Sequence, residues 1–236
     1  MSHHYLRFER VGYRYPDAHE ALHDISFELR HGEKAAVVGV NGAGKSTLLL
    51  HTDGLLLPTS GRIVVGDVPI TKRTLPVIRR TVGYVFQQPD DQLFMPTVGE
   101  DVAFGPANMG LDEAEIDRRV VEALTAVGAE SLRDRSPAHL SGGQKKRVAI
   151  ATVLAMGPSV LVMDEPTAAL DPQARRQLID LIRGFSHTTL IATHDMALVR
   201  ELCTRVLVLH RGTLAADGPA AEILSNHELL AACGLE

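Results

Sequence analysis

The chain lacks tryptophan, is poor in cysteine and contains no long apolar run. Its two cysteines among 236 residues, Cys203 and Cys233, suit neither a metal site nor a disulfide framework, so we expect buried or unreactive thiols in a reducing compartment. No apolar stretch approaches the roughly 20 residues of a membrane span. The start, Met1–Tyr5, has neither the basic head nor the apolar run of a signal peptide. These absences exclude a disulfide-stapled scaffold and a chain that crosses a bilayer by itself.

The charges of the chain are mixed in sign and spread along the sequence. Lysine and arginine total 24, aspartate and glutamate total 29, and the formal net charge is −5. This distribution gives no basic footprint for DNA or RNA, so we expect no nucleic-acid partner. Hydrophobic residues make up 45% of the chain, which is enough for one sizeable core or for two small lobes that share a sheet.

The clearest motif is the glycine-rich stretch 39–47, Gly-Val-Asn-Gly-Ala-Gly-Lys-Ser-Thr, which fits the phosphate-loop pattern G-x-x-x-x-G-K-S/T. The apolar run 35–38 predicts a buried strand before it, and residues 46–51 predict a helix after it. Glycines let successive backbone N–H groups turn inward and hold an anion. Lys45 is then expected to reach the β- and γ-phosphates, and the Ser46 hydroxyl to bind Mg²⁺. An ordinary glycine-rich turn is the alternative, and the flanking strand and helix disfavour it.

Extended and helical patterns divide the chain into three parts. Up to Val85, apolar alternation and turn residues predict antiparallel strands together with the first parallel strand. From Pro89 to about Gly157, β-branched runs give way to helices. Beyond that point, apolar runs separated by helical stretches predict strands of a parallel sheet. The predicted strands are Tyr5–Tyr15, Ala21–Leu29, Ala35–Val38, Arg62–Val65, Val160–Met163, Thr188–Thr193 and Arg205–Leu209.

One helix of the middle part has clear start and stop signals. Asp112 and Glu115 have the spacing of a capping box, in which each side chain binds the backbone N–H of the other residue. Gly128 supplies a stop at the far end. The apolar residues between them share one helical face; they are Ile116, Val120, Leu124 and Val127.

Two carboxylates follow the predicted strand 160–163. The carboxyl ends of parallel strands are where open α/β sheets bind ligands. Asp164 is therefore a candidate Mg²⁺ ligand, directly or through water, and Glu165 is a candidate to polarise the water that attacks a γ-phosphate. Because many strands end in a polar turn, the pair alone is weak evidence for a Mg²⁺ site. It supports such a site only in combination with the phosphate loop.

The stretch Leu140–Gln144, which reads Leu-Ser-Gly-Gly-Gln, predicts a specialised helix start. Ser141 is a natural N-cap, and the two glycines that follow expose backbone N–H groups. The basic residues 145–147 come next, in the first turn, where cations oppose the helix dipole. We therefore expect an anion or an acidic surface nearby; a glycine-rich helix start without a ligand is the alternative.

Taken together, five stretches resemble the ATP-binding-cassette (ABC) ATPases in order and spacing over residues 5–218: the phosphate loop, Leu140–Gln144, Asp164-Glu165, Ala169–Asp171 and Thr193–Asp195. The resemblance implies an α/β, P-loop NTPase fold, with a mixed-sheet RecA-like core, an antiparallel β subdomain and an inserted α-helical subdomain. We expect one nucleotide-binding domain over 1–236. Its core and β subdomain are predicted at 1–88 and 158–220, its helical subdomain at 89–157 and a short helical tail at 221–236.

The resemblance also implies roles for single residues. Tyr15 is the candidate to stack on adenine, with Tyr13 as its rival. Glu165 is the implied catalytic carboxylate, His194 the switch at the γ-phosphate, and Gln87 the sensor of Mg²⁺ and water that links to the membrane partner. The implied Mg²⁺ ligands are Ser46, Gln87 and Asp164. The other implied ATP-binding residues are Asn41, Gly42, Gly44, Lys45, Ser46 and Thr47 of the phosphate loop, and Ser141, Gly143, Gln144 and Asp171, which face a second copy.

A second copy is expected because one phosphate loop holds the triphosphate from one side only. The γ-phosphate charge is surrounded when another chain docks head-to-tail with its 141–144 loop against the nucleotide. The family therefore implies a homodimer with two ATP and Mg²⁺ between its chains, whose opening after hydrolysis is the mechanical output.

Two further segments narrow the subfamily. Phe86–Phe94 and Ala103–Asn108 look like the ATPases of energy-coupling-factor importers, and most resemble the cobalt and nickel uptake branch. The implied partners are integral membrane subunits, and the implied location is the cytoplasmic face of the cell membrane. Two departures are Ala169, where many relatives carry serine, and a tail after Gly218 that is shorter than in many vitamin importers.

Other functions stay open at this point. The same core serves vitamin and other micronutrient importers, and it serves soluble scaffold ATPases such as that of iron–sulfur cluster assembly, which the Phe86–Phe94 string disfavours. A DNA-repair cassette would need a long coiled-coil insertion, and the sequence has no sustained heptads.

Overall fold

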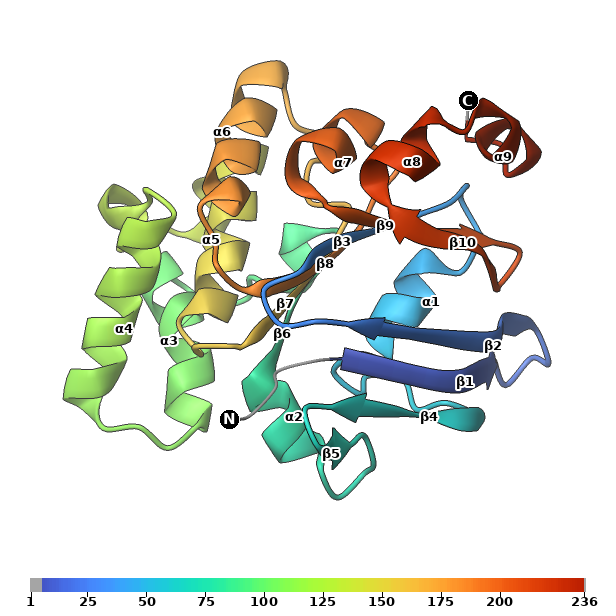
Figure 1. The fold of residues 1–236 in the computed structure, drawn as a ribbon. Coiled ribbons are helices and arrows are strands. Elements are labelled where there is room, and N and C mark those ends of the chain that lie inside the picture. The colour runs from blue at the N-terminus through green and yellow to red at the C-terminus, as the bar shows by residue number, and fades with distance from the viewer. Residues whose placement is uncertain (1–5, 236) are drawn as a thin grey trace. The chain divides into compact units, whose positions relative to one another are not determined.

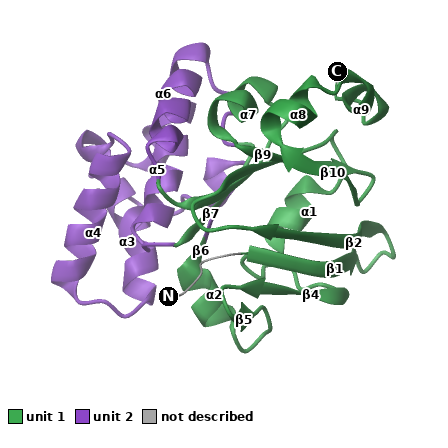
Figure 2. Ribbon diagram, in the orientation of Figure 1, with its two compact units in different colours: residues 1–82, 159–165, 186–236 green, residues 83–158, 166–185 purple. Residues whose placement is uncertain are grey.

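The computed structural model describes residues 6–235 (Figure 1), so the signal-peptide prediction for 1–5 lies outside the described part. The chain forms two compact units (Figure 2). Unit 1 comprises residues 1–82, 159–165 and 186–236, and unit 2 comprises residues 83–158 and 166–185. The strand β6 (Val82–Val85) carries the chain from the first unit into the second.

Unit 1 contains a four-stranded antiparallel sheet in the order β2-β1-β4-β5. Buried and exposed positions alternate along most of β2, and the stacked rings of Phe8 and Phe27, with centroids 4.6 Å apart, mark the directly paired register of β1 and β2. Gly61 is required where β4 crosses β1, because a Cβ there would lie 2.2 Å from the Arg10 carbonyl oxygen. The strands are β1 (Leu6–Arg14), β2 (Glu20–Leu29), β4 (Ser60–Val65) and β5 (Val68–Pro69).

The second sheet of unit 1 positions the phosphate loop. Its central strands run parallel, in the order β9-β3-β8-β7, and β10 pairs antiparallel with β9 at one edge. Strands β7 and β8 are buried along their whole length, as the apolar runs predict for a sheet that is covered on both faces. The strands are β3 (Lys34–Val38), β7 (Val160–Asp164), β8 (Thr188–Ala192), β9 (Arg205–His210) and β10 (Thr213–Pro219).

Short helices complete unit 1. The helix α1 follows the phosphate loop and packs on β7, β8 and β2, while α8 packs on β10 and α7. Both cysteines lie buried at the carboxyl ends of helices, Cys203 after α7 and Cys233 after α9. The helices are α1 (Lys45–Leu50), α2 (Leu75–Thr81), α7 (Met196–Leu202), α8 (Ala220–Ser225) and α9 (His227–Ala232).

Unit 2 is helical. Helices α3, α4 and α5 pack against one another, and α6 packs on α5 (Figure 1). Capping boxes begin α3 at Thr97 and α5 at Ser141. The helices are α3 (Val98–Asn108), α4 (Glu113–Ala126), α5 (Gly142–Leu154) and α6 (Pro172–Arg183), with single 3₁₀ turns at Pro89–Asp91, Glu130–Leu132 and Pro137–His139.

The capping box predicted at the start of α4 is only half present. Asp112 accepts the Glu115 backbone N–H at 2.9 Å, as expected. The Glu115 carboxylate does not return the bond and instead accepts from Arg118 and Arg119. Charge-assisted bonds to two guanidinium groups outcompete a bond to one neutral N–H, and they hold the pKa of Glu115 at about 2.

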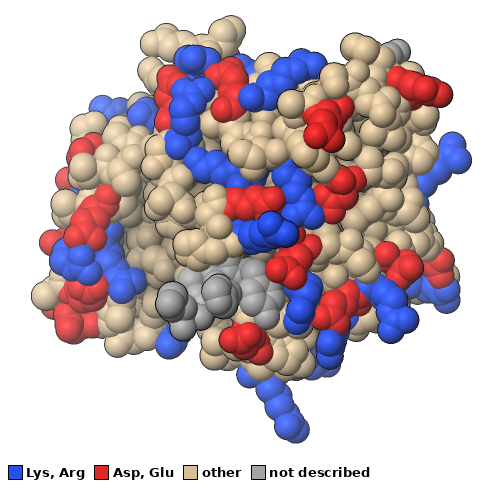
Figure 3. All heavy atoms as spheres, in the orientation of Figure 1, with Lys and Arg blue, Asp and Glu red and all other residues tan. Residues whose placement is uncertain are grey.

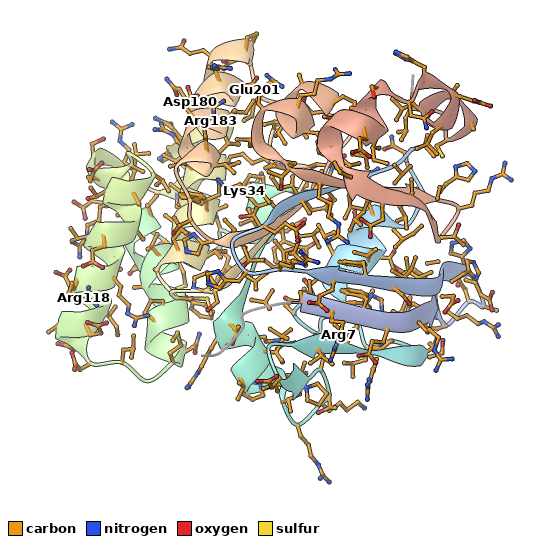
Figure 4. All side chains as sticks on the ribbon, in the orientation of Figure 1. Arg7, Lys34, Arg118, Asp180, Arg183 and Glu201 are labelled. Atoms are coloured by element: carbon orange, nitrogen blue, oxygen red, sulfur yellow. The ribbon has the colours of Figure 1, made fainter. Side chains whose placement is uncertain are left out.

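Charged side chains of both signs are interspersed on the surface shown in Figure 3. Many are paired: Arg118 points outward from α4 between Glu115 and Glu122, and Arg183 of α6 pairs with Asp180 (Figure 4). Among residues 6–235, no helix combines the length and the apolar character that crossing a bilayer requires.

Candidate functional site

The phosphate loop lies at the carboxyl end of β3 and runs into α1. Gly44, the residue before α1, has φ +105°, and a Cβ there would lie 2.8 Å from the Ala21 carbonyl oxygen. A Cβ on Gly39 would lie 2.4 Å from the Leu209 carbonyl oxygen. Both ends of the loop are therefore open only to glycine, whereas Asn41 and Gly42 at its tip are exposed.

Lys45 is buried inside this loop. Its ammonium group donates to the carbonyl oxygens of Gly39 at 2.7 Å and Val40 at 3.2 Å. Burial lowers the pKa of the ammonium group, and the charges of Glu165 and Asp164 oppose that decrease. The loop thus holds a cation whose charge interacts with the two carboxylates predicted from the sequence.

Ser46 and Asp164 provide oxygen donors that fit Mg²⁺. The Ser46 hydroxyl is exposed in the first turn of α1, and Asp164 is a buried carboxylate at the carboxyl end of β7, on which α1 packs. A hydroxyl and a carboxylate are hard ligands of the kind that Mg²⁺ prefers. The third predicted ligand, Gln87, is exposed and lies in unit 2.

Glu165 is held in place by the segment that follows β8. Its backbone has φ +43°, unusual for a side chain of this type, and its N–H donates to the Ala192 carbonyl at 2.8 Å. Oε2 accepts from the Thr193 hydroxyl at 3.0 Å, and Oε1 lies 2.9 Å from Nδ1 of His194. Because a carboxylate only accepts, Nδ1 of His194 carries the proton. The carboxylate is buried, whereas the His194 side chain is 67% exposed.

Tyr15 lies beside α1, immediately after β1. Its hydroxyl is 3.0 Å from the Thr47 hydroxyl, and its ring lies nearly parallel to that of His19, 6.3 Å away between centroids. The rival Tyr13 instead meets the rings of Tyr15 and His51 edge-on. Tyr15 is thus the tyrosine whose hydroxyl contacts the phosphate-loop helix.

A second group of predicted residues lies in unit 2, at the start of α5. Ser141 accepts the Gln144 N–H at 3.3 Å, and the Gln144 side chain accepts the Ser141 N–H at 2.9 Å. Gly143 faces α6, where an added Cβ would lie 2.9 Å from Cβ of Ala174. Asp171 caps α6 by accepting the Ala174 N–H at 2.8 Å. These residues are brought together at the adjacent starts of two helices.

The basic residues after this helix start are occupied within unit 2. Lys145 forms an ion pair with Asp90 at 2.5 Å; the anion or acidic surface expected near these cations stays a prediction. Lys146 is only 4% exposed and donates to the backbone carbonyl of Gln87 at 2.6 Å. Arg147 donates to the carbonyls of Val127 and Gly128 at the end of α4.

Gln92 attaches the segment that contains Gln87 to a later part of α5. Its amide donates to the Ala149 carbonyl and the Thr152 hydroxyl, both at 2.7 Å, and its oxygen accepts the Phe86 N–H at 3.1 Å. Residues 86–92, which include Gln87, are therefore tied to the helix that begins at Ser141. We call this segment the Gln87 strap.

Four residues that hold parts of the site in place were not singled out from the sequence for that role: Thr193, Lys146, Gln92 and His51. Thr193 stands inside a motif that was noticed, so its hydroxyl could have been assigned to Glu165. Lys146 and Gln92 also stand inside stretches singled out above, the basic run 145–147 and Phe86–Phe94, but their partners are distant in the sequence and no spacing rule identifies them. His51 acts through a backbone carbonyl and ring contacts, for which the sequence offers no signal.

Comparison with known proteins agrees with this geometry. The profile of the ABC transporter family matches residues 22–168. A Geobacter sulfurreducens protein classed among ABC transporter ATP-binding proteins is 58% identical over 236 residues, covering all of this chain and 95% of that protein. The energy-coupling factor transporter ATP-binding protein EcfA1 of Methanospirillum hungatei is 49% identical over 237 residues, covering 99% of this chain and 86% of that protein.

Two solved structures are also similar. The cbiO1 protein of Clostridium perfringens, part of the ABC transporter complex cbiONQ, superposes with a TM-score of 0.86 at 41% identity, over 99% of this chain and 96% of that one. The cassette MJ0796, a dimer bound to ADP and phosphate after hydrolysis, gives a TM-score of 0.81 at 27% identity, over 91% and 98%. The chain therefore belongs to the ABC transporter family and is an ATP-hydrolysing subunit of the energy-coupling-factor type.

Proposed function

We propose that this chain hydrolyses ATP to energise the uptake of a transition-metal ion, cobalt or nickel, through an energy-coupling-factor importer. One observation carries the catalytic part: the phosphate loop with Lys45 and the Glu165–His194 pair meet in the same unit, at the carboxyl ends of adjacent parallel strands. The metal ion is the cargo, and its assignment rests on the likeness of Phe86–Phe94 and Ala103–Asn108 to the cobalt and nickel branch.

In this proposal the phosphate loop binds the triphosphate. The ammonium group of Lys45 exchanges its carbonyl partners for β- and γ-phosphate oxygens, and the backbone N–H groups of residues 41–47 surround the phosphates. Ser46 and Asp164 would hold Mg²⁺, which neutralises phosphate charge when bound. Tyr15 supplies the aromatic surface for the adenine ring.

Glu165 is the proposed group that orients and polarises the attacking water. Its bonds to Thr193 and His194 hold both carboxylate oxygens in place, as is expected of a group that must present a fixed oxygen to water. His194 is largely exposed, so its imidazole is accessible to the γ-phosphate while Nδ1 stays bonded to Glu165, and in this proposal it acts as the switch.

The residues at the start of α5 would complete the site of a second copy. Ser141 and Gly142 are exposed at this helix start, where backbone N–H groups and a hydroxyl are available to an anion. We assign Ser141, Gly143, Gln144 and Asp171 to the nucleotide bound by the partner chain. The working form is then a homodimer with two nucleotides between its chains, as the dimeric state of MJ0796 supports.

Unit 2 would also bind the membrane partner. Phe94 is 63% exposed and Phe104 is 45% exposed, and their rings pack edge-on with centroids 4.9 Å apart. Asp101 fixes the backbone beneath them by accepting the Phe94 and Met95 N–H groups, both at 3.0 Å. An exposed aromatic pair held on a fixed backbone suits a helix of an integral membrane subunit, which would place this chain at the cytoplasmic face of the membrane.

The domain boundaries given under Sequence analysis are retained as part of the proposal. Within these boundaries the core and β subdomain carry the phosphate loop, Gln87 and Glu165, and the helical subdomain carries Ser141.

The proposal is tested by co-expressing the chain with the membrane proteins encoded beside it. We expect a complex that transports labelled Co²⁺ or Ni²⁺ across vesicle membranes only when ATP is present on the side of the membrane that carries this chain. The variant Phe94→Ser, Phe104→Ser should lose the complex while its isolated ATPase activity persists. Uptake of a vitamin, or association with soluble scaffold proteins alone, would reject the metal-import proposal.

A further inference from the structure

Four residues close a ring of contacts between the end of β1 and the phosphate-loop helix α1. The Thr47 hydroxyl lies 3.0 Å from the Tyr15 hydroxyl, and the Thr47 carbonyl lies 2.6 Å from Nδ1 of His51. Tyr13 joins the two ends of this series, with its ring centroid 4.7 Å from that of His51 and 4.8 Å from that of Tyr15. Both ring contacts are edge-on, the favourable arrangement for aromatic pairs.

His51 is the buried member of this ring. It is 0% exposed, and because a carbonyl only accepts, its Nδ1 must carry the proton and donate it to Thr47. Its own backbone N–H bonds to the Leu48 carbonyl at 3.3 Å and leaves the Thr47 carbonyl to the imidazole. The side chain therefore ends α1 with its imidazole fixed in one tautomer and one orientation. Burial also lowers the pKa of His51, in agreement with a neutral ring.

A simpler explanation is that His51 is a helix cap and has no further role. The carbonyls at the end of a helix need donors, and His51 supplies one. Yet Thr52 makes the same kind of bond at the same helix end, from its hydroxyl to the Leu49 carbonyl at 2.6 Å, and it takes no part in the ring contacts. His51 differs from Thr52 in two ways. The residue that His51 caps, Thr47, also contacts Tyr15, and Tyr13 packs on the rings of both His51 and Tyr15.

We propose that His51 and Tyr13 are positioning residues that set the plane of the Tyr15 ring relative to the phosphate loop, and so determine how strongly the chain binds the base of its nucleotide. This inference rests on the proposed role of Tyr15 as the surface for adenine. The phosphates bind to Lys45 and to the backbone N–H groups of residues 41–47, and Tyr15 contacts this set at the Thr47 hydroxyl rather than at the backbone. Loss of either positioning residue should therefore weaken binding of the base and spare binding of the phosphates.

The test compares two probes on the full chain, MgATP and magnesium tripolyphosphate, by calorimetry in the presence of a Glu165→Gln substitution that slows hydrolysis. We expect His51→Phe, which keeps a ring but loses the bond to Thr47, and Tyr13→Leu, which loses the edge-on contacts, each to weaken ATP binding by about three- to tenfold. Tripolyphosphate binding should change by less than about twofold. Thr52→Val is the matched control, because it removes a bond of the same kind at the same helix end, and it should preserve the ratio of the two affinities.

The outcomes separate this inference from the function on which it rests. Tyr15→Ala should abolish the preference for ATP over tripolyphosphate, since base stacking on an aromatic ring is commonly worth about tenfold or more; if the preference survives, the role of Tyr15 and this inference both fail. If Tyr15→Ala behaves as expected but His51→Phe and Tyr13→Leu weaken both probes equally, or neither, the inference alone is overturned. Tyr13 is partly exposed, so its variant keeps the test decisive if the buried His51→Phe chain does not fold.

Discussion

The carboxylate of Glu165 is fixed through both of its oxygens, by His194 on one and Thr193 on the other. A group held in this way can orient a water molecule without rearranging, which is how a pre-positioned base lowers a barrier. The positive φ of Glu165 indicates that the backbone is also constrained at this residue. Function at this position therefore depends on the charge of the carboxylate as well as on its place.

Replacing Glu165 by glutamine keeps the shape and removes the charge. We expect MgATP binding to remain while turnover falls by a factor of about 10² to 10⁴, the usual contribution of a positioned base. Steady-state phosphate release and nucleotide binding measured on the same sample check both parts. Lys45→Ala is the comparison variant, since it should lose nucleotide binding itself. Near-normal turnover in Glu165→Gln would remove the carboxylate from the catalytic role.

Asp53 makes the stability of the chain depend on pH. It is 7% exposed, it accepts the Leu55 N–H at 3.1 Å, and burial raises its pKa from 3.8 to about 6. A carboxyl whose folded pKa is raised contributes stability that is fully present below the unfolded pKa and is lost as pH rises through the folded pKa. The loss should develop between about pH 4 and pH 6.5 and reach about 3 kcal/mol, an upper bound.

The variant Asp53→Asn isolates this effect, because an amide oxygen can still accept the Leu55 N–H but does not ionise. We expect it to be more stable than the natural chain at pH 7.5, by up to about 3 kcal/mol, and to lose the advantage at pH 4. Urea unfolding at the two pH values measures the difference. Asp17→Asn serves as the control, since Asp17 is exposed and also accepts one backbone N–H. Equal stability differences at both pH values would show that Asp53 is not the source.

At the scale of elements, local patterns predicted what depends on local chemistry. The buried strands around the phosphate loop and the N-caps at Asp112 and Ser141 agree with the structure because apolar runs and capping residues act within a few positions. The prediction that the Glu115 carboxylate accepts the backbone N–H of Asp112 was wrong because two arginines compete for that carboxylate. The edge strand β10 was missed because its burial alternates only between exposed and half-exposed, although Arg211-Gly212, both with positive φ, is a hairpin turn signal that could have indicated it.

The Gln87 strap shows what local patterns cannot reach. Lys146 and Gln87 are 59 positions apart, and their bond exists only because α5 packs beside residues 86–92. In this arrangement, the helix proposed to meet the nucleotide of the second copy is attached directly to the segment proposed to meet the membrane partner. A change at Ser141 can therefore reach Gln87 through one helix.

Replacing Lys146 by methionine should loosen the Gln87 strap without unfolding α5. The methionine keeps the apolar stem of the lysine and loses the ammonium group, which leaves the Gln87 carbonyl without that donor. We expect amide hydrogen exchange across residues 86–92 to become roughly tenfold faster or more, the usual contribution of a bond to a charged group. Affinity for ATP measured without Mg²⁺ should remain, because the phosphate loop belongs to unit 1.

Lys145→Met is the control for this experiment. Lys145 pairs with Asp90, whose side chain is 71% exposed, and exposed ion pairs contribute little. Exchange in the 86–92 segment should therefore change much less than in Lys146→Met. If the two variants behave alike, or if exchange is unchanged in both, the buried bond does not hold the strap.

For the whole molecule, the proposed dimer makes a prediction about which defects can complement each other. In a head-to-tail pair, each nucleotide lies between the phosphate loop of one chain and the Ser141 loop of the other. Lys45→Ala removes the first half of a site and Ser141→Arg blocks the second. When these substitutions are carried by different chains, a mixed dimer has both defects in one site and leaves the other site intact. When one chain carries both and its partner carries none, each site has one defect.

We therefore expect hydrolysis to reappear when the inactive Lys45→Ala and Ser141→Arg chains are mixed, up to about a quarter of the natural activity if chains pair at random and sites act independently. The linked comparison, a natural chain fused to one with both substitutions, should stay near background, although half of its chains are unaltered. Phosphate release from the two preparations at equal site concentration measures the contrast. Activity in the fused pair above that of the mixed pair would mean that each chain completes its own site, and the head-to-tail arrangement would then be rejected.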